Sequence, residues 1–147
     1  IPHIAGVKEA SGNMTKICEV CHVVPDNFIV LSGDDALTLP AMAVGARGVI
    51  SVASNEVPGP MSRMVEAFER NDAAGARELH HHLLPLMQIN FVESNPIPVK
   101  ASLAMMGLLE EHYRLPMVPL RSESRAKLAN VLSAMSLLPD AGAVAAA

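Results

Sequence analysis

The sequence predicts an α/β protein in which parallel strand–helix units are followed by a block of helices. Three short apolar segments, centred on Val7, Ile29 and Ile50, lie 22 and 21 residues apart, which is the spacing of successive strands joined by helices. All three segments are apolar on both faces. Such continuous burial is typical of parallel strands covered by helices on one side and by further helices or a closed barrel interior on the other.

The first strand–helix unit is predicted between residues 4 and 23. Residues 4–10 (IAGVKEA) read as an apolar strand with a β-branched centre, and the following Ser-Gly-Asn at 11–13 supplies turn and N-cap chemistry. A helix over 14–23 follows, because its apolar side chains recur every three or four residues. The segment 25–27 (PDN) stops this helix.

The next two units repeat the pattern. Residues 28–31 are the second predicted strand, residues 33–35 (GDD) turn and cap the chain, and a short helix over 36–44 ends at Gly45. Residues 48–53 (GVISVA) form the third predicted strand. The rest of the chain has helical patterns at 60–71, 73–89, 96–110 and 122–137.

We therefore divide the chain into three parts. Residues 1–71 hold the strand–helix units, residues 72–140 form a separate helical extension, and residues 141–147 (AGAVAAA) are expected to be a disordered tail. The chain opens without an initiator Met and directly in an apolar segment, so we expect it to be a fragment of a longer protein.

The composition favours an enzyme that acts on small molecules. Half of the 147 residues are hydrophobic, 18% are charged and the formal net charge is −4, so a core can form and no basic surface attracts nucleic acid. Two cysteines are too few for a disulfide framework, and no secretion signal is recognisable, which predicts a cytoplasmic location. Charged residues interrupt every apolar stretch, so no membrane span is expected.

Lys8 is the first candidate catalytic residue, because it ends an apolar strand at the edge where parallel sheets and barrels place active sites. A desolvated lysine has a lowered pKa, so its neutral amine can attack a carbonyl and form a Schiff base. The alternative is a solvated lysine paired with Glu9 or another carboxylate. Residues 33–35 and 54–55 end the next two strands with polar groups at the same edge, although each aspartate alone reads as a helix cap.

Three further patterns predict structural or surface roles. Residues 18–22 (CEVCH) match the haem-attachment motif C-x-x-C-H, but they lie inside an amphipathic helix, where both cysteines are interpreted as structural. The histidines at 80–82 fan around a helix and cannot face one metal ion together, so a solvated face is expected. Lys100 lies in the first turns of a helix, with no apolar strand to desolvate it, and is expected at the surface.

Four ordered motifs carry a family resemblance. They are GVKEASGN at 6–13, LSGDD at 31–35, GVISV at 48–52 and NPIPVK at 95–100. Together they resemble the 4-hydroxy-tetrahydrodipicolinate synthase (dihydrodipicolinate synthase) family over residues 1 to about 138. The resemblance implies that the chain holds the last three strand–helix units of a (β/α)8 TIM barrel, which is therefore incomplete, and a C-terminal helical extension.

The resemblance also implies a mechanism. Lys8 matches the family's Schiff-base lysine, which forms an imine with pyruvate; the resulting enamine attacks L-aspartate 4-semialdehyde, and ring closure follows on the route to diaminopimelate and lysine. Gly33 and Ile50 match positions whose backbone lines the pyruvate pocket. The resemblance implies no metal and no cofactor other than the covalent imine on Lys8, and a homotetramer for the whole enzyme.

Other family features have no counterpart in this chain: the Gly-Thr-Thr-Gly-Glu loop, the proton-relaying tyrosine, the arginine that binds the substrate carboxylate and the lysine feedback site. Tyr113 lies in a loop of the extension and does not replace that tyrosine, so the chain alone is expected to be inactive. Two alternatives stay open. One is a related class I aldolase for N-acetylneuraminate or a 2-keto-3-deoxy sugar acid, and the other is a non-catalytic half-barrel that acts as an assembly module.

Overall fold

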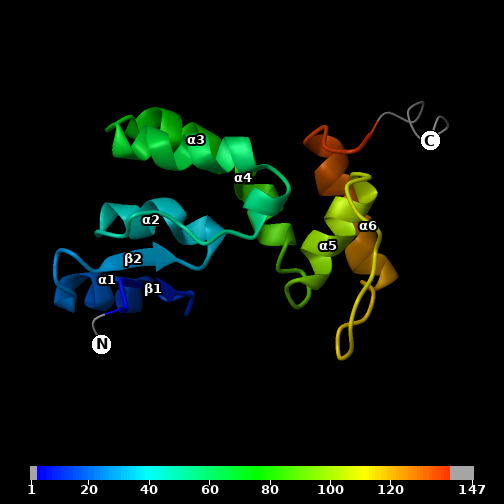
Figure 1. Cartoon of the computed structure of the whole chain (residues 1–147). Helices are drawn as coiled ribbons and strands as arrows, with labels where there is room; N and C mark the ends of the chain where they lie inside the picture. Colours follow the sequence, from blue (N-terminus) through cyan, green and yellow to red (C-terminus); the bar gives the residue numbers. More distant parts are fainter. Residues whose placement is uncertain (1–2, 140–147) are drawn as a thin grey trace. The chain divides into compact units, whose positions relative to one another are not determined.

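The computed structural model of this chain describes residues 3–139 (Figure 1). The chain divides into two compact units between Leu84 and Pro85, and each unit is described by itself. The predicted disordered tail, residues 141–147, lies outside the described residues. Within the described range, no helix is both long and apolar enough to cross a bilayer.

The first unit opens with two parallel strands, β1 (Gly6–Glu9) and β2 (Ile29–Ser32), joined by helix α1 (Met14–Val23). Both predicted strands are present, each displaced or shortened by a few residues, and α1 has the predicted bounds. In the sheet register Lys8 lies beside Leu31. This pairing places the end of β1, with its lysine, next to the end of β2.

One face of the sheet is covered by helices. Val30 of β2 packs there with Ile17 of α1 and Ala41 of α2 (Thr38–Ala43) in a buried apolar cluster. Within this unit, α2 lies between the sheet and α3 (Pro58–Glu69) (Figure 1). The α-helix predicted over 36–44 is shorter than expected. A 3₁₀ turn over Asp35–Leu37 takes the place of its first turn, and α2 begins after it.

The opposite face of the sheet is open. Because strand side chains alternate, Lys8, Ile29 and Leu31 share this face. Ile29 and Ile50 remain 44% and 47% exposed. The strands are apolar on both faces, but within the described residues only the helix-covered face has other parts of the chain packed on it.

The predicted third strand, over 48–53, is wrong beyond its first residues. Val49 forms a single parallel bridge with Ser32, and the chain then enters a 3₁₀ turn at Ala53–Asn55. The two N–H groups at the start of this turn bond to the Asp35 carboxylate. These groups are therefore not available to pair with a strand.

The remaining helices follow the predicted order. Helix α4 (Ala73–Ile89) has the predicted bounds, whereas α5 (Ile97–Met105) and α6 (Ser122–Ala134) end earlier than predicted. Gly107 and Ser136 lie just beyond the ends of α5 and α6 and adopt positive φ angles of 76° and 56°. Such left-handed residues terminate helices. The first predicted helix of this block also shifts, since α3 begins two residues before and ends two residues before the predicted bounds of 60–71.

The second unit has its own core. Helix α5 packs on α6, and the segment between them runs alongside both helices (Figure 1). The buried apolar side chains come from all three helices of the unit: Leu86, Met87, Ile97, Val99, Leu128 and Leu132. This unit therefore has a buried apolar core built from its helices, while Leu108 and Leu115 stay exposed.

Candidate active site at the strand ends

A hollow of about 280 Å³ lies on the open face of the sheet. Lys8 supplies its single ionisable side chain, and the other lining residues are glycine or apolar: Ala5, Gly6, Val7, Ile29, Leu31 and Ile50. We call this feature the Lys8 hollow. It joins two of the three predicted site residues, Lys8 and Ile50, in one apolar-walled space.

Gly33 lies against the Lys8 side chain. A Cβ atom built on Gly33 would be 2.8 Å from Lys8 Cε and 2.4 Å from Ala10 Cβ, closer than real side chains approach one another. The Gly33 N–H donates to the Glu9 carbonyl at 2.6 Å, which fixes this close approach. A side chain at position 33 would push Lys8 aside, so the glycine leaves room beside the amine.

The alternative pairing of Lys8 with Glu9 is not formed. Glu9 Oε1 accepts a hydrogen bond from the Ser11 N–H at 3.1 Å, and neighbouring residues on a strand point to opposite faces. Within residues 3–139, no ion pair or hydrogen bond engages the Lys8 ammonium group. Lys8 is therefore available for a ligand that enters the hollow.

The two aspartates after β2 have different roles. Asp34 Oδ1 accepts the Ala36 N–H at 2.9 Å, which confirms the predicted cap. Asp35 is 1% exposed, and its Oδ2 accepts the N–H groups of Val52 at 3.0 Å and Ala53 at 2.9 Å. The cap interpretation is wrong for Asp35, because its partners lie 17 and 18 residues away, and no local sequence signal identifies them.

The other sequence patterns resolve into structural positions. Cys21 is partly buried against the core of the first unit, and burial, followed by the nearby Cys18, raises the pKa of its thiol. Cys18 is exposed, so its interpretation as a core residue is wrong. Burial, with a smaller contribution from the adjacent His81, lowers the pKa of His80. In the described part of the chain, no three His, Cys, Asp or Glu side chains are grouped as metal ligands would be.

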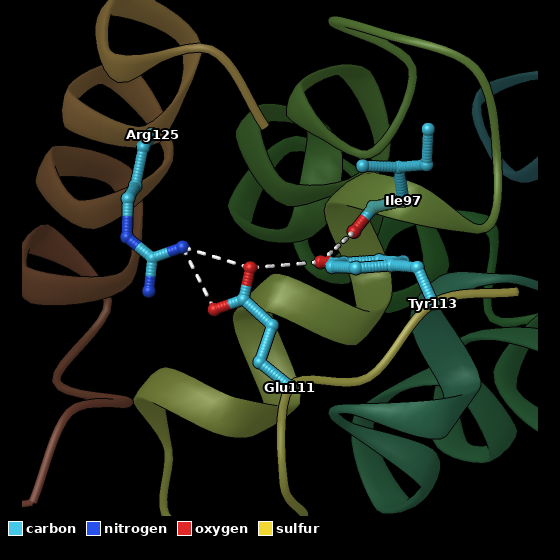
Figure 2. Close-up of polar contacts among 4 residues, drawn as sticks. All are labelled: Ile97, Glu111, Tyr113 and Arg125. Atoms are coloured by element: carbon cyan, nitrogen blue, oxygen red, sulfur yellow. Dashed lines mark hydrogen bonds and ion pairs between the residues drawn. The ribbon is translucent and has the colours of Figure 1, made fainter. Parts of the chain in front are cut away.

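A second polar cluster lies in the helical unit (Figure 2). The Tyr113 hydroxyl lies 3.0 Å from Glu111 Oε1 and 3.3 Å from the Ile97 carbonyl oxygen, within hydrogen-bond distance of both. Arg125 Nη1 donates to Glu111 Oε1 at 2.9 Å and lies 2.8 Å from Oε2. We call these four residues the Glu111 cluster.

The Glu111 cluster is arranged for structure rather than proton transfer. Burial, the hydrogen bond to Glu111 and the charge of Glu111 raise the pKa of Tyr113 to about 12, so the hydroxyl stays protonated near neutral pH. Lys100 donates to the His112 carbonyl and lies 5.4 Å from the centre of the Tyr113 ring. Tyr113 and Lys100 therefore both have partners within the helical unit.

Comparison with known proteins places this geometry in a family. The model of the dihydrodipicolinate synthetase family matches residues 1–135. The chain belongs to this family. A 4-hydroxy-tetrahydrodipicolinate synthase from Koribacter versatilis is 58% identical to this chain. The match covers 96% of this chain and 47% of the relative.

Solved structures of dihydrodipicolinate synthases have the same fold over nearly the whole chain. The enzyme from Aquifex aeolicus is 42% identical with a TM-score of 0.90, over 95% of this chain and 47% of that one. The enzyme from Acinetobacter baumannii, solved with pyruvate, is 36% identical with a TM-score of 0.89, over 94% and 47%. The family resemblance of the four motifs is confirmed, and the chain spans about half the length of the curated relatives it matches.

Proposed function

We propose that this chain is the Schiff-base-forming part of a synthase that condenses pyruvate with L-aspartate 4-semialdehyde to give 4-hydroxy-tetrahydrodipicolinate. The observation that carries the proposal is the Lys8 hollow, where one free amine lies among apolar side chains with Gly33 against it. The names of the curated relatives and the pyruvate complex of the Acinetobacter baumannii enzyme support the same chemistry.

Lys8 is the nucleophile in this proposal. Its neutral amine attacks the ketone carbon of pyruvate, and loss of water gives the imine. Loss of a proton from the methyl group then gives an enamine, whose carbon attacks the aldehyde carbon of the semialdehyde. Ring closure follows and releases the lysine. The protonated imine accepts the electron pair that the departing methyl proton leaves behind, and the enamine donates that pair to the aldehyde carbon, so this sequence of steps needs neither a metal nor another cofactor.

The surroundings of Lys8 suit this reaction. The hollow has apolar walls, and Lys8 itself is exposed in the described residues. Gly33 and Ile50 would contribute backbone groups to a pyruvate beside Lys8, because the glycine has no side chain between its backbone and the amine. We assign these two residues to substrate binding and Lys8 to catalysis.

The hollow is proposed to be completed by further chain. We infer that residues 1–71 are the last three strand–helix units of a (β/α)8 barrel and residues 72–140 its helical extension, within a cytoplasmic homotetramer. The exposed apolar face of the sheet and the half-length match to relatives support this arrangement. Sequencing the DNA upstream of the Ile1 codon tests it: an open frame with further strand–helix units supports it, and a stop codon or unrelated sequence contradicts it.

Borohydride trapping tests the nucleophile. The complete enzyme that includes this chain is incubated with pyruvate, reduced with borohydride and digested, and the peptides are weighed by mass spectrometry. We expect the reduced pyruvate adduct on the Lys8 peptide, no adduct in Lys8→Arg and an unchanged adduct in Lys100→Arg. An adduct on Lys100, or none on the unsubstituted enzyme, contradicts the assignment.

The substrate choice is tested separately. Product analysis with L-aspartate 4-semialdehyde, and with the aldehydes of N-acetylneuraminate and 2-keto-3-deoxy sugar acid aldolases, distinguishes the synthase from those aldolases. The purified 147-residue chain alone is expected to show no turnover, because one apolar face of its sheet has no other part of the chain packed on it. Turnover by the purified monomeric chain contradicts that expectation.

A further inference from the structure

Asp35 lies two positions after Gly33, and its side chain joins two strand-end loops. The residue is 1% exposed and starts the 3₁₀ turn that follows Gly33 by two positions. Its Oδ2 accepts hydrogen bonds from the N–H groups of Val52 and Ala53, which follow Ile50 by two and three positions. One carboxylate oxygen thus links the loop after Gly33 to the loop after Ile50.

The backbone of the turn that carries Asp35 is held by hydrogen bonds. The Thr38 hydroxyl donates to the Asp35 carbonyl at 2.8 Å, and the preceding Asp34 caps the same turn. The second carboxylate oxygen of Asp35, Oδ1, is buried and accepts no hydrogen bond from the described residues. All the hydrogen bonds that this side chain accepts therefore go to the loop after Ile50.

Backbone pairing does not hold that loop. Parallel pairing with β2 ends where the Ile50 N–H donates to the Ser32 carbonyl at 2.8 Å. Beyond Ile50, two hydrogen bonds join residues 51–55 to residues 33–37 in the described part of the chain, and both go to Asp35. Burying a carboxylate is costly unless it is hydrogen-bonded, so these two bonds and the Asp35 position depend on one another.

We propose that Asp35 is a positioning residue of the active site, which fixes the loop after Ile50 relative to Gly33 and so sets the space beside Lys8 in which the keto acid binds. This role rests on the proposed function of Lys8. It assigns Asp35 no contact with substrate. A displacement of about 1 Å at a reacting group can cost on the order of 100-fold in rate. A substitution at Asp35 is therefore expected to weaken formation of the imine between Lys8 and pyruvate.

The test compares Asp35→Ala with Asp34→Ala in the complete enzyme. Both variants lose a buried or capping carboxylate next to Gly33, but only Asp35→Ala frees the Val52 and Ala53 N–H groups. We expect Asp35→Ala to raise the pyruvate concentration for half-maximal borohydride trapping, and the KM for pyruvate, by about 10-fold or more. The KM for the aldehyde is expected to change less, and Asp34→Ala is expected to stay close to the unsubstituted enzyme in both values.

Asp35→Asn keeps the test decisive if the alanine variant does not fold. The amide oxygen can still accept both N–H groups, so this variant is expected to recover most of the pyruvate affinity. Hydrogen exchange supplies a readout that does not depend on activity, because the Val52 and Ala53 amides should lose protection in Asp35→Ala and keep it in Asp35→Asn.

The outcomes separate the two proposals. If the unsubstituted enzyme is not trapped by pyruvate, the proposed function fails and the role of Asp35 fails with it. If it is trapped normally and folded Asp35→Ala has an unchanged trapping curve, only the role of Asp35 is overturned. Equal losses in Asp35→Ala and Asp34→Ala also overturn it, because they indicate general weakening of the turn.

Discussion

The surroundings of the Lys8 hollow and the Glu111 cluster differ in the hydrogen-bond partners of their polar side chains and in the exposure of their apolar ones. Around Lys8, the carboxylate of Asp35 bonds to backbone N–H groups, and Ile29 and Ile50 remain partly exposed on the open sheet face. In the Glu111 cluster, Glu111 bonds directly to the side chains of Tyr113 and Arg125, above a core that is closed by its own helices.

This difference separates a sheet with one uncovered apolar face from a unit with a buried helical core. The sheet leaves apolar side chains in solvent, as expected for strands whose second cover lies outside the described residues. The helical unit has a buried core that includes Leu128 and Leu132, although Leu108 and Leu115 stay exposed, and Glu111, Tyr113 and Arg125 are paired with one another. Substitutions should therefore affect the stability of the 147-residue chain mainly in the helical unit, and its chemistry mainly at the sheet.

The largest effect on stability is expected from Leu128→Ala. Leu128 is fully buried in α6, and removing such a side chain leaves a cavity that costs about 2–5 kcal/mol in the free energy of unfolding. Urea unfolding of the 147-residue chain measures the change. Leu115→Ala is the control, because Leu115 is 87% exposed, and its change should stay within about 0.5 kcal/mol. Equal changes in the two variants contradict the placement of the core.

Glu111→Gln should have a smaller effect. The change removes the ion pair with Arg125 and weakens the acceptor for Tyr113, and it should cost about 1 kcal/mol because the pair is only partly exposed. Glu123→Gln is the matched control: its pair with Lys127 is largely solvent-exposed, so no measurable change in the urea midpoint is expected. A loss in Glu123→Gln as large as in Glu111→Gln would show that burial does not distinguish the two pairs.

Tyr113 should make the stability of the chain fall at alkaline pH. Its pKa is raised to about 12, by burial first and then by Glu111, whereas in the unfolded chain it is near the ordinary value of 10. Between these values the unfolded chain holds fewer protons than the folded one, so the free energy of unfolding decreases as pH rises. Tyr113→Phe should remove this part of the decline in a pH series of urea unfolding curves. An unchanged slope in Tyr113→Phe contradicts the pKa assignment.

The smallest effect on stability is expected at the open sheet face. Ile29→Thr keeps a β-branched side chain in the strand, and Ile29 is partly exposed, so the free energy of unfolding should fall by less than about 1 kcal/mol. Exposed apolar strands promote association, so sedimentation velocity should show less self-association in this variant. A loss as large as that of Leu128→Ala would mean that the face is covered in the isolated chain.

Much of the fold could be predicted from local sequence. Helices α1 and α4 have the predicted bounds, because their apolar periodicity and flanking turn residues act within a few positions. The ends of α5 and α6 could not be placed, because a run of apolar residues continues past the left-handed residues that stop each helix. Cys18 was misplaced because helical spacing alone does not show which side faces the core.

The candidate site was predicted in part. The position of Lys8 at a strand end identified it, and the structure places Ile50 in the same hollow and Gly33 against the Lys8 side chain. Asp35 was missed as a connector between loops, since a Gly-Asp-Asp sequence is equally compatible with two caps. The Glu111 cluster was missed for a related reason: its members come from three separate segments, α5, the loop and α6.

By itself, the sequence determined the strand–helix order, the helix caps and the four motifs that mark the family, because each depends on residues close together in the chain. The tertiary structure decided where the third strand stops, which sheet face stays open and which polar groups meet. These outcomes depend on partners 14 to 18 residues apart, such as Asp35 with Ala53 and Glu111 with Arg125. Packing of the folded chain brings such partners together, and no local sequence pattern shows which residues will meet.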